Sequence, residues 1–186
     1  MAMYWYKRNS QHILKAIVIL ICNVTLFSCV STDPAQKKRA ELFDLPSFFQ
    51  SEIKSLKETN PTITKTVRKD SISEVQEIKI KNWDTELASF VAIDINKPAY
   101  SGYVDIDSVD NLVTYTITNP DLDLSCIQIQ YKNGKANDIV IERKVKNSLY
   151  NTTELLEYRK NDSYTVEKNQ AVKVVGENYY KIKGEF

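Results

Sequence analysis

Apolar and polar residues alternate along most of the chain with the two-residue period of β-strands. Nine segments show this alternation or are rich in β-branched and aromatic residues. They span 62–69, 72–81, 100–107, 112–118, 122–132, 136–146, 149–159, 164–175 and 178–183. The last seven are joined by short turns, and Asn133-Gly134 is the strongest local signal for a hairpin. The pattern therefore predicts a long antiparallel meander, preceded by a first hairpin around Lys69-Asp70-Ser71.

Two segments before the meander follow the period of an α-helix instead. From 45 to 58 apolar residues recur at helical spacing behind Asp44 and an early proline, and from 83 to 94 they recur behind Asn82 as the N-cap. Aromatic residues on these stripes would plug the concave face of the sheet: Phe48, Phe49, Trp83 and Phe90. We expect an α+β fold in which two N-terminal helices pack on a long antiparallel meander sheet, either curved as a half-barrel or closed as a barrel.

The first 28 residues have another pattern, in which three basic residues precede an apolar run. The run, from 16 to 27, is shorter than the about 20 residues that a membrane-spanning helix needs. At its end the sequence reads Leu26-Phe27-Ser28-Cys29. This tetrapeptide resembles the lipobox of bacterial lipoproteins, whose cysteine is acylated and becomes the first residue of the mature chain. Phe27 departs from the small residue usual at its position.

The resemblance, to small envelope lipoproteins of Bacteroidota, implies three parts. Residues 1–28 would be a signal peptide, residues 29–41 an acylated Cys29 with a polar tether, and residues 42–186 a single α+β domain. The lipid would attach the protein to the membrane. Val30 after the cysteine and the basic Lys37-Lys38-Arg39 favour the outer membrane and its periplasmic face.

If residues 1–28, the leader, are removed as a signal peptide, fewer residue types remain for catalysis and metal binding. The leader contains the only histidine, His12, and one of the three cysteines, so the chain from Cys29 onward has no histidine. This excludes Ser-His-Asp and Cys-His catalysis and zinc sites built on imidazole. With Cys29 acylated, Cys126 is the one remaining thiol, and no intramolecular disulfide can form. We expect no cofactor and no metal.

Charge argues against nucleic acid as a partner. The leader holds three of the 25 basic residues and none of the 24 acidic ones, so the remaining chain has 22 basic and 24 acidic residues. A nucleic-acid-binding domain would show a basic surplus. With four glycines the chain also lacks the glycine-rich motifs that cradle phosphates.

Tyrosines are concentrated from residue 100 onward, where the meander is predicted, and each offers an apolar ring with a polar tip. A ligand pocket or contact surface could be lined by Tyr100, Tyr103, Tyr115, Tyr131 and Tyr158. Alternatively they are ordinary strand aromatics scattered over both faces. Asp70-Ser71-Ile72 and Asp107-Ser108-Val109 resemble the O-glycosylation sequon of exported Bacteroidota proteins, which implies modification at Ser71 and Ser108.

Two functions remain open. The first is a non-enzymatic, lipid-anchored envelope protein that binds an apolar ligand, a glycan or another envelope protein. The alternative is a hydrolase of an envelope or glycan substrate that uses carboxylates alone, for example two of Glu142, Glu154 and Glu157. A pocket lined by tyrosines and aliphatic residues would favour binding, and a deep pocket with two facing carboxyls would favour hydrolysis.

Overall fold

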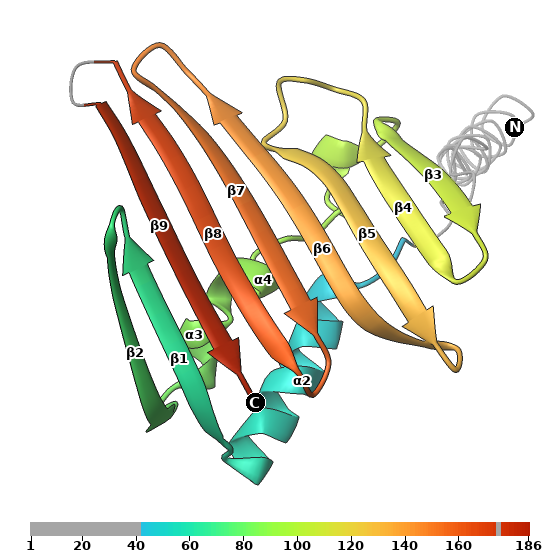
Figure 1. The fold of residues 1–186 in the computed structure, drawn as a ribbon. Helices are drawn as coiled ribbons and strands as arrows, with labels where there is room; N and C mark the ends of the chain where they lie inside the picture. The colour runs from blue at the N-terminus through green and yellow to red at the C-terminus, as the bar shows by residue number, and fades with distance from the viewer. Residues whose placement is uncertain (1–41, 174–175) are drawn as a thin grey trace, which may run out of the picture. The chain divides into compact units, whose positions relative to one another are not determined.

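Residues from Glu41 to Phe186 form one compact unit, of which the computed structural model describes residues 42–173 and 176–186. In these described residues, nine strands form a single antiparallel sheet in the order β2-β1-β9-β8-β7-β6-β5-β4-β3 (Figure 1). The strands are β1 (Thr62–Lys69), β2 (Ile72–Lys79), β3 (Val104–Val109), β4 (Leu112–Ile117), β5 (Leu124–Lys132), β6 (Lys135–Lys146), β7 (Tyr150–Arg159), β8 (Ser163–Val172) and β9 (Gly176–Glu185). The meander and the first hairpin are confirmed, and the sheet is open rather than closed, with β2 and β3 at its edges.

The tight turns occur where turn residues predicted them. Asn133 and Gly134 have φ values of 53° and 72°, the positive pair that a type I′ hairpin turn requires. Asp70, at φ 52°, begins the turn between β1 and β2, and Asn161, at φ 57°, is the middle residue of the turn between β7 and β8. Both lie in the left-handed region, which Asp and Asn tolerate better than most residues. Local turn chemistry thus sets where three of the hairpins reverse.

Helix α2 (Leu45–Thr59) is the first predicted helix. The Asp44 side chain accepts a hydrogen bond from the Ser47 amide at 3.0 Å, and a proline occupies the first turn. Asn60, in the left-handed conformation at φ 44°, ends the helix. Both termini are therefore capped by residues suited to the task.

The expectation of two N-terminal helices is wrong for the second segment. In place of one helix over 83–94 there are two four-residue helices, α3 (Trp83–Glu86) and α4 (Ala88–Val91), which meet at Leu87. Asn82 is the N-cap of α3 as predicted. Leu87 and Phe90 are both fully buried. Such short helices have almost no stability of their own, so burial against the sheet determines the path of the chain.

A further difference lies at the start of β3, which was predicted to begin at residue 100. The short 3₁₀ helix η2 (Pro98–Tyr100) occupies this position instead, and β3 begins at Val104. Pro98 starts η2, where its fixed φ is compatible with a helical turn. Tyr100 therefore lies outside the strands.

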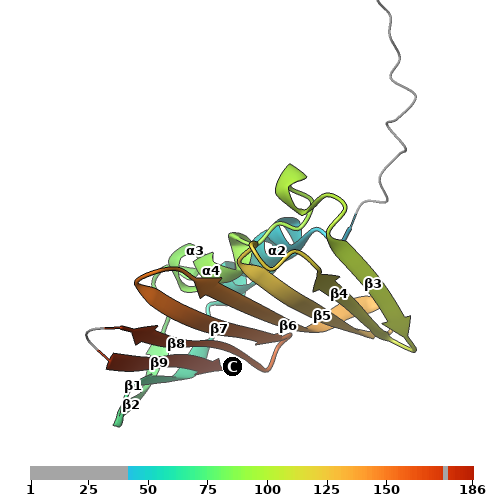
Figure 2. The same cartoon turned by 90° about the horizontal axis from the view of Figure 1, so that it is seen from above.

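The helices of the described residues, α2, α3, α4 and η2, lie on one face of the sheet, which we call the inner face (Figures 1 and 2). The core between them is aromatic at its centre: the rings of Phe49 and Phe90 are 4.8 Å apart, and that of Phe49 is 5.3 Å from Tyr158. The inward residues of the central strands complete this core: Ile127, Ile129, Ile139, Ile141 and Leu156. Within residues 42–173 and 176–186, none of the helices has the length and apolar character needed to span a bilayer.

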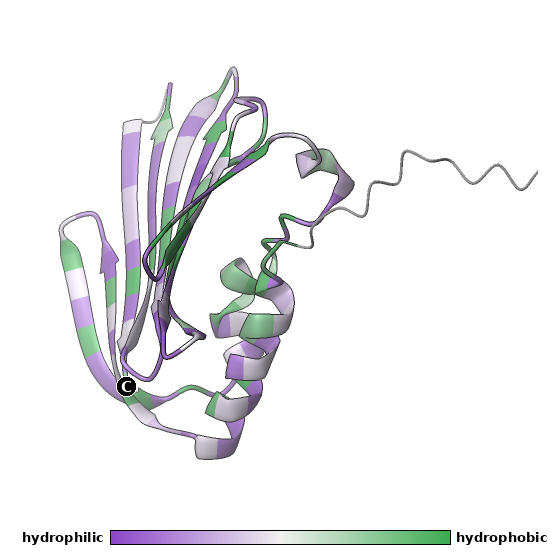
Figure 3. Ribbon diagram, turned by 90° about the vertical axis from the view of Figure 1, so that its right-hand side faces the viewer, coloured by the Kyte–Doolittle hydropathy of each residue, from purple (hydrophilic) through white to green (hydrophobic). Residues whose placement is uncertain are grey.

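The helices cover only part of the inner face. In Figure 3 the α-helices lie beside one end of the long strands, whose other end extends past them. Along the inner side of β7 the residues change accordingly: Leu156 and Tyr158 are buried, whereas Tyr150 and Glu154 are only half-buried. The uncovered end of the inner face is thus more polar than the covered end.

Candidate functional site

Arg143 of β6 is the centre of a polar network at the uncovered end of the inner face. Its Nη1 donates a hydrogen bond to Glu154 Oε2 at 2.7 Å, and its Nη2 donates to Asp123 Oδ2 at 2.5 Å. The hydroxyl of Tyr100 donates to the other oxygen of Asp123 at 3.1 Å. One guanidinium thus joins two carboxylates, and a phenol supports one of them.

Strand register explains how this network forms. Arg143 is directly opposite Glu154 in β7, so the two side chains share one face. On its other side Arg143 is opposite Leu124, the first residue of β5, which brings the preceding Asp123 within reach. Tyr100 comes from η2, which follows the helical segment. Three separate parts of the chain therefore meet at one arginine.

Two small cavities flank Arg143. The first, of about 170 Å³, lies on the inner side of β6 to β8 and is called the strand cavity; it is lined by Arg143, Val145, Tyr150, Thr152, Glu154, Lys168 and Gln170. The second, of about 270 Å³, lies beside the segment that follows α4 and is called the loop cavity; it is lined by Ala92, Ile93, Asp94, Lys97, Tyr100, Asp123, Leu124 and Arg143. Both are below the usual range of about 300 to 1,000 Å³ for drug-sized ligands, so each suits a small group.

The network shifts the pKa values of Asp123, Arg143 and Tyr100. Burial by itself would raise the pKa of Asp123, but the hydrogen bond and charge of Arg143, aided by Tyr100, hold that pKa below its ordinary value. Burial likewise opposes the charge on Arg143, yet the two carboxylates raise its pKa further. Burial and the negative charge of Asp123 raise the pKa of Tyr100 to about 12. Tyr100 is therefore a neutral donor at physiological pH.

The ion pair of Asp123 predicts a pH effect. Because its folded-state pKa lies below the ordinary value of 3.8, the pair contributes stability above that pH, and the contribution is lost as pH falls through the folded-state pKa. We expect Arg143→Ala to raise the pKa of Asp123, because the effect of burial is then opposed only by the hydrogen bonds from Tyr100 and from the backbone. NMR titration of the Asp123 carboxyl measures this. Lys144→Ala, on the opposite face, should leave it unchanged, and an unmoved pKa in Arg143→Ala would contradict the assigned pair.

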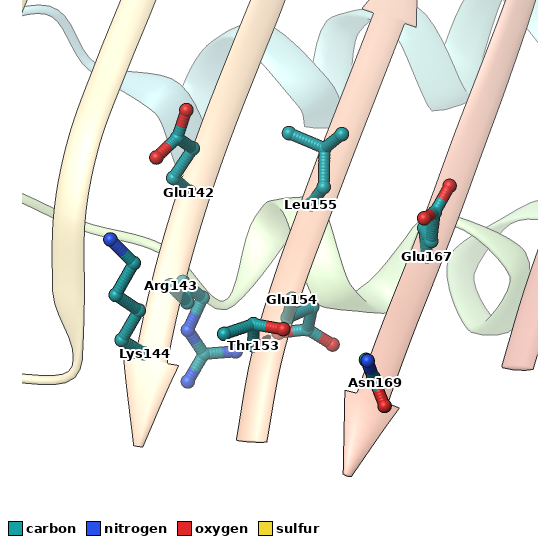
Figure 4. A pocket seen from close by; sticks show the side chains of 8 residues that line it. All are labelled: Glu142, Arg143, Lys144, Thr153, Glu154, Leu155, Glu167 and Asn169. Atoms are coloured by element: carbon teal, nitrogen blue, oxygen red, sulfur yellow. Dashed lines mark hydrogen bonds and ion pairs between the residues drawn. The ribbon is translucent and has the colours of Figure 1, made fainter. Parts of the chain in front are cut away.

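A third cavity, of about 200 Å³, opens on the outer face of the sheet. Figure 4 shows Glu142, Leu155 and Glu167 on the side of the strands away from the helices, whereas Arg143 and Glu154 point to the helix side. The remaining residues that line it are Lys144, Thr153 and Asn169. Charged and polar side chains thus surround a shallow site on an exposed face.

The three carboxylates considered for hydrolysis do not all lie on the same face of the sheet. Glu142 is opposite Leu155 and Glu157 is opposite Val140, so both lie on the outer face, where they are exposed. Glu154 lies on the inner face with Arg143. It cannot act together with either of the other two on one substrate bond.

The five tyrosines proposed from the sequence do not converge on one pocket. Tyr115 and Tyr158 are buried in the core, at 7% and 2% exposure, and Tyr131 packs half-buried at its margin. Tyr103 is 43% exposed. Only Tyr100 contacts the Arg143 network.

The polar tips of two core tyrosines anchor helices. Tyr158 and Tyr164 are directly opposite each other in β7 and β8. Tyr158 donates its hydroxyl hydrogen bond to Glu52 of α2 at 2.8 Å, and Tyr164 donates to Glu86 of α3 at 2.5 Å. Each carboxylate has a lysine as its second partner, Lys160 for Glu52 and Lys65 for Glu86. Glu52, which is buried, and Glu86, which is half-buried, therefore attach helices to the sheet and are not free for chemistry.

Several residues at the site were not found from the sequence. Arg143 and Asp123 are 20 positions apart and belong to no motif. Tyr150, which lines the strand cavity, could have been placed beside Glu154, because residues separated by an even number along a strand share a face. That alternation is the one sequence signal that pointed to part of the site.

The predicted lipidation and glycosylation sites lie apart from the Arg143 network. Cys29 lies outside the described residues. Ser71 is exposed in the turn between β1 and β2, whereas Ser108 is exposed within β3 rather than in a turn.

Burial, and then the charge of Glu142, raise the pKa of the Cys126 thiol, which is opposite to what a nucleophile needs. Among the residues that the structure describes, no cluster of three or more metal-binding side chains occurs.

Comparison with protein-family models, with curated proteins and with solved structures gives no match to this chain.

Proposed function

We propose that this protein is a non-enzymatic, lipid-anchored envelope protein that binds a polar, glycan-like ligand at the uncovered end of its inner face. The observation that carries the proposal is Arg143, held by two carboxylates between two cavities on that face. An arginine has five N–H donors, so Arg143 keeps donors for a ligand beyond the two that it uses. Carboxylate oxygens and the amide of Gln170 add acceptors and donors, which match the hydroxyl groups of a sugar.

The filled interior favours a polar ligand over an apolar one. Phe49 and Phe90 are completely buried between the helices and the sheet, where an acyl chain would otherwise have to lie. The two inner cavities are small and have charged residues in their walls. Tyr150 and Tyr100 offer ring faces at their margins, on which the apolar face of a sugar can stack.

The charges of the site favour binding over hydrolysis. Glycoside hydrolysis needs one carboxyl whose pKa is raised enough to donate a proton near neutral pH. The pKa of Asp123 is lowered by Arg143, and Glu154 is paired with the same arginine. Asp123 is therefore not prepared to be a general acid. The hydrolase alternative therefore has no supporting pair at this site.

Substitution of Arg143 tests the ligand site. Arg143→Lys keeps a positive charge but cannot bridge two carboxylates in a fixed plane, so we expect affinity for the ligand to fall about tenfold or more, equivalent to at least about 1.4 kcal/mol. The probe is a set of neutral and acidic oligosaccharides released from the envelope of the producing cells, measured by titration calorimetry. Lys144→Ala is the matched control because this neighbour lies on the outer face. Equal affinities for the parent and Arg143→Lys would refute the site.

Substitution of Cys29 tests the anchor separately. Acylation requires the thiol, so Cys29→Ala should be unprocessed or released from membranes in flotation gradients, whereas Cys126→Ala should float like the parent. A mature-size Cys29→Ala protein that still floats would contradict the lipoprotein proposal. Protease added to intact cells should spare the parent if it faces the periplasm.

A further inference from the structure

Strand β2 is one edge of the sheet, and among residues 42–173 and 176–186 no strand pairs with its free side. Seven of its eight residues are exposed and one is half-buried. Ile72 and Val75 are exposed by 71% and 62%, although both are apolar. An edge strand presents a row of unpaired backbone N–H and C=O groups, on which another strand can pair.

The hairpin geometry shows which backbone groups are free. A two-residue turn at Asp70 and Ser71 joins β1 to β2, and Lys69 and Ile72 are the closing pair. In such a hairpin the closing pair exchanges both of its hydrogen bonds, and bonded and non-bonded pairs then alternate. Ser73, Val75 and Glu77 therefore direct their N–H and C=O groups away from β1.

The sequence of β2 is complementary to itself in one antiparallel register. When two copies pair about a two-fold axis at Val75, apolar residues meet apolar residues and no like charges are opposed. The pairs are Val75 with Val75, Ser73 with Glu77, Glu74 with Gln76, and Ile72 with Ile78. In this register every backbone hydrogen bond between the two copies is made by Ser73, Val75 and Glu77. These are the residues whose N–H and C=O groups point away from β1.

Neighbouring registers are less favourable. A two-fold axis at Glu74 or at Glu77 opposes two like carboxylates. An axis at Gln76 places Val75 opposite Glu77 and Glu74 opposite Ile78, so each apolar residue faces a charge. The Val75 register is thus selected by both charge and burial.

The opposite edge of the sheet is protected by charge. Strand β3 carries Asp105 and Asp107, and a two-fold axis at Ile106 or Asp107 sets aspartates opposite each other. Pairing of β3 with β2 would place these aspartates near Glu74 and Glu77. Open-ended assembly through both edges is therefore disfavoured, and a closed two-fold pair is the remaining arrangement.

We propose that a second copy of this chain docks on β2, so that the two sheets continue into one another through an antiparallel β2–β2 junction centred on Val75. The proposal is independent of the ligand site. Attachment of both copies to one membrane would raise their effective concentration and so support a junction of limited area.

Disulfide cross-linking in membranes tests the register. In the full chain carrying Cys126→Ser, Val75→Cys places two thiols opposite each other at a Cα separation of about 5.5 Å, within the range for a disulfide. Glu77→Cys is the control: it is equally exposed, but its two copies would be four residues apart along the strands, about 13 Å. We expect mild oxidant to give at least tenfold more covalent homodimer with Val75→Cys than with Glu77→Cys.

The other outcomes overturn the proposal. Equal or greater cross-linking at Glu77→Cys would refute the register, and absence of homodimer at both positions would refute the junction. A product that contains another protein would replace the second copy by a different partner.

Discussion

Phe90→Ala is expected to lower the free energy of unfolding by about 3 to 5 kcal/mol, the usual cost of deleting a buried phenyl group. The side chain is 0% exposed, and its ring lies 4.8 Å from that of Phe49 and 6.2 Å from that of Tyr158. Its removal leaves a cavity between α4 and the sheet and loosens the contact of α4 with α2. A domain of this size has about 5 to 15 kcal/mol in total, so denaturant unfolding should show a large shift of the midpoint.

Leu149→Ala is the control for this measurement. Leu149 is also a large apolar residue, but it is 69% exposed, and its truncation should change stability by no more than about 0.5 kcal/mol. A melting temperature of Phe90→Ala within a degree or two of the parent would mean that the helices lie loosely on the sheet. That result would reopen the inner face to an apolar ligand and weaken the case for a polar one.

The antiparallel sheet could be predicted because its determinants are local. Each strand has one face against the core, so the two-residue alternation is visible in the sequence. Asn133-Gly134 and Asp70-Ser71 mark turns through backbone conformations that few residues adopt. The helix stripes predicted most of the aromatic residues that enter the core: Phe49, Trp83 and Phe90 are buried, whereas Phe48 is half-buried at its margin.

The parts that could not be predicted depend on contacts between distant segments. The pairing of β9 with β1 joins the two ends of the domain, and no local pattern encodes it. The break at Leu87 follows from burial of this residue and Phe90 against the sheet. Residues 100–103 alternate like a strand, yet Pro98 begins a 3₁₀ turn there.

The candidate site was missed for the same reason. Arg143, Asp123 and Tyr100 come together only once β5, β6 and η2 are in place. Strand parity could have separated the glutamates, because it puts Glu154 on the inner face and both Glu142 and Glu157 on the outer face. Tyrosines, in turn, are poor guides to a pocket in this chain, since Tyr158 uses its hydroxyl to hold Glu52 of a helix.

Gly184→Ala is expected to destabilise the protein by about 2 to 5 kcal/mol, through overpacking together with the loss of a partly buried hydrogen bond. Gly184 in β9 is directly opposite Tyr164 in β8, and the tyrosine ring lies across it. A Cβ atom at Gly184 would be 2.1 Å from Tyr164 Cε1 and 2.7 Å from its hydroxyl oxygen. The ring must therefore move away from Glu86, to which its hydroxyl is bonded at 2.5 Å, and from Trp83.

A double-variant cycle distinguishes this mechanism from a general intolerance of β9 to substitution. Tyr164→Ala alone should be strongly destabilising, because the ring is 99% buried and its removal leaves a cavity next to Trp83. In that background the obstacle to a Cβ atom at Gly184 is gone, and alanine restricts the unfolded chain more than glycine does. Adding Gly184→Ala to Tyr164→Ala should then be neutral or stabilising by about 0.5 to 1 kcal/mol, so the same substitution changes sign. Equal destabilisation by Gly184→Ala in both backgrounds would show that the glycine is required for some reason other than the ring that anchors α3 to the sheet.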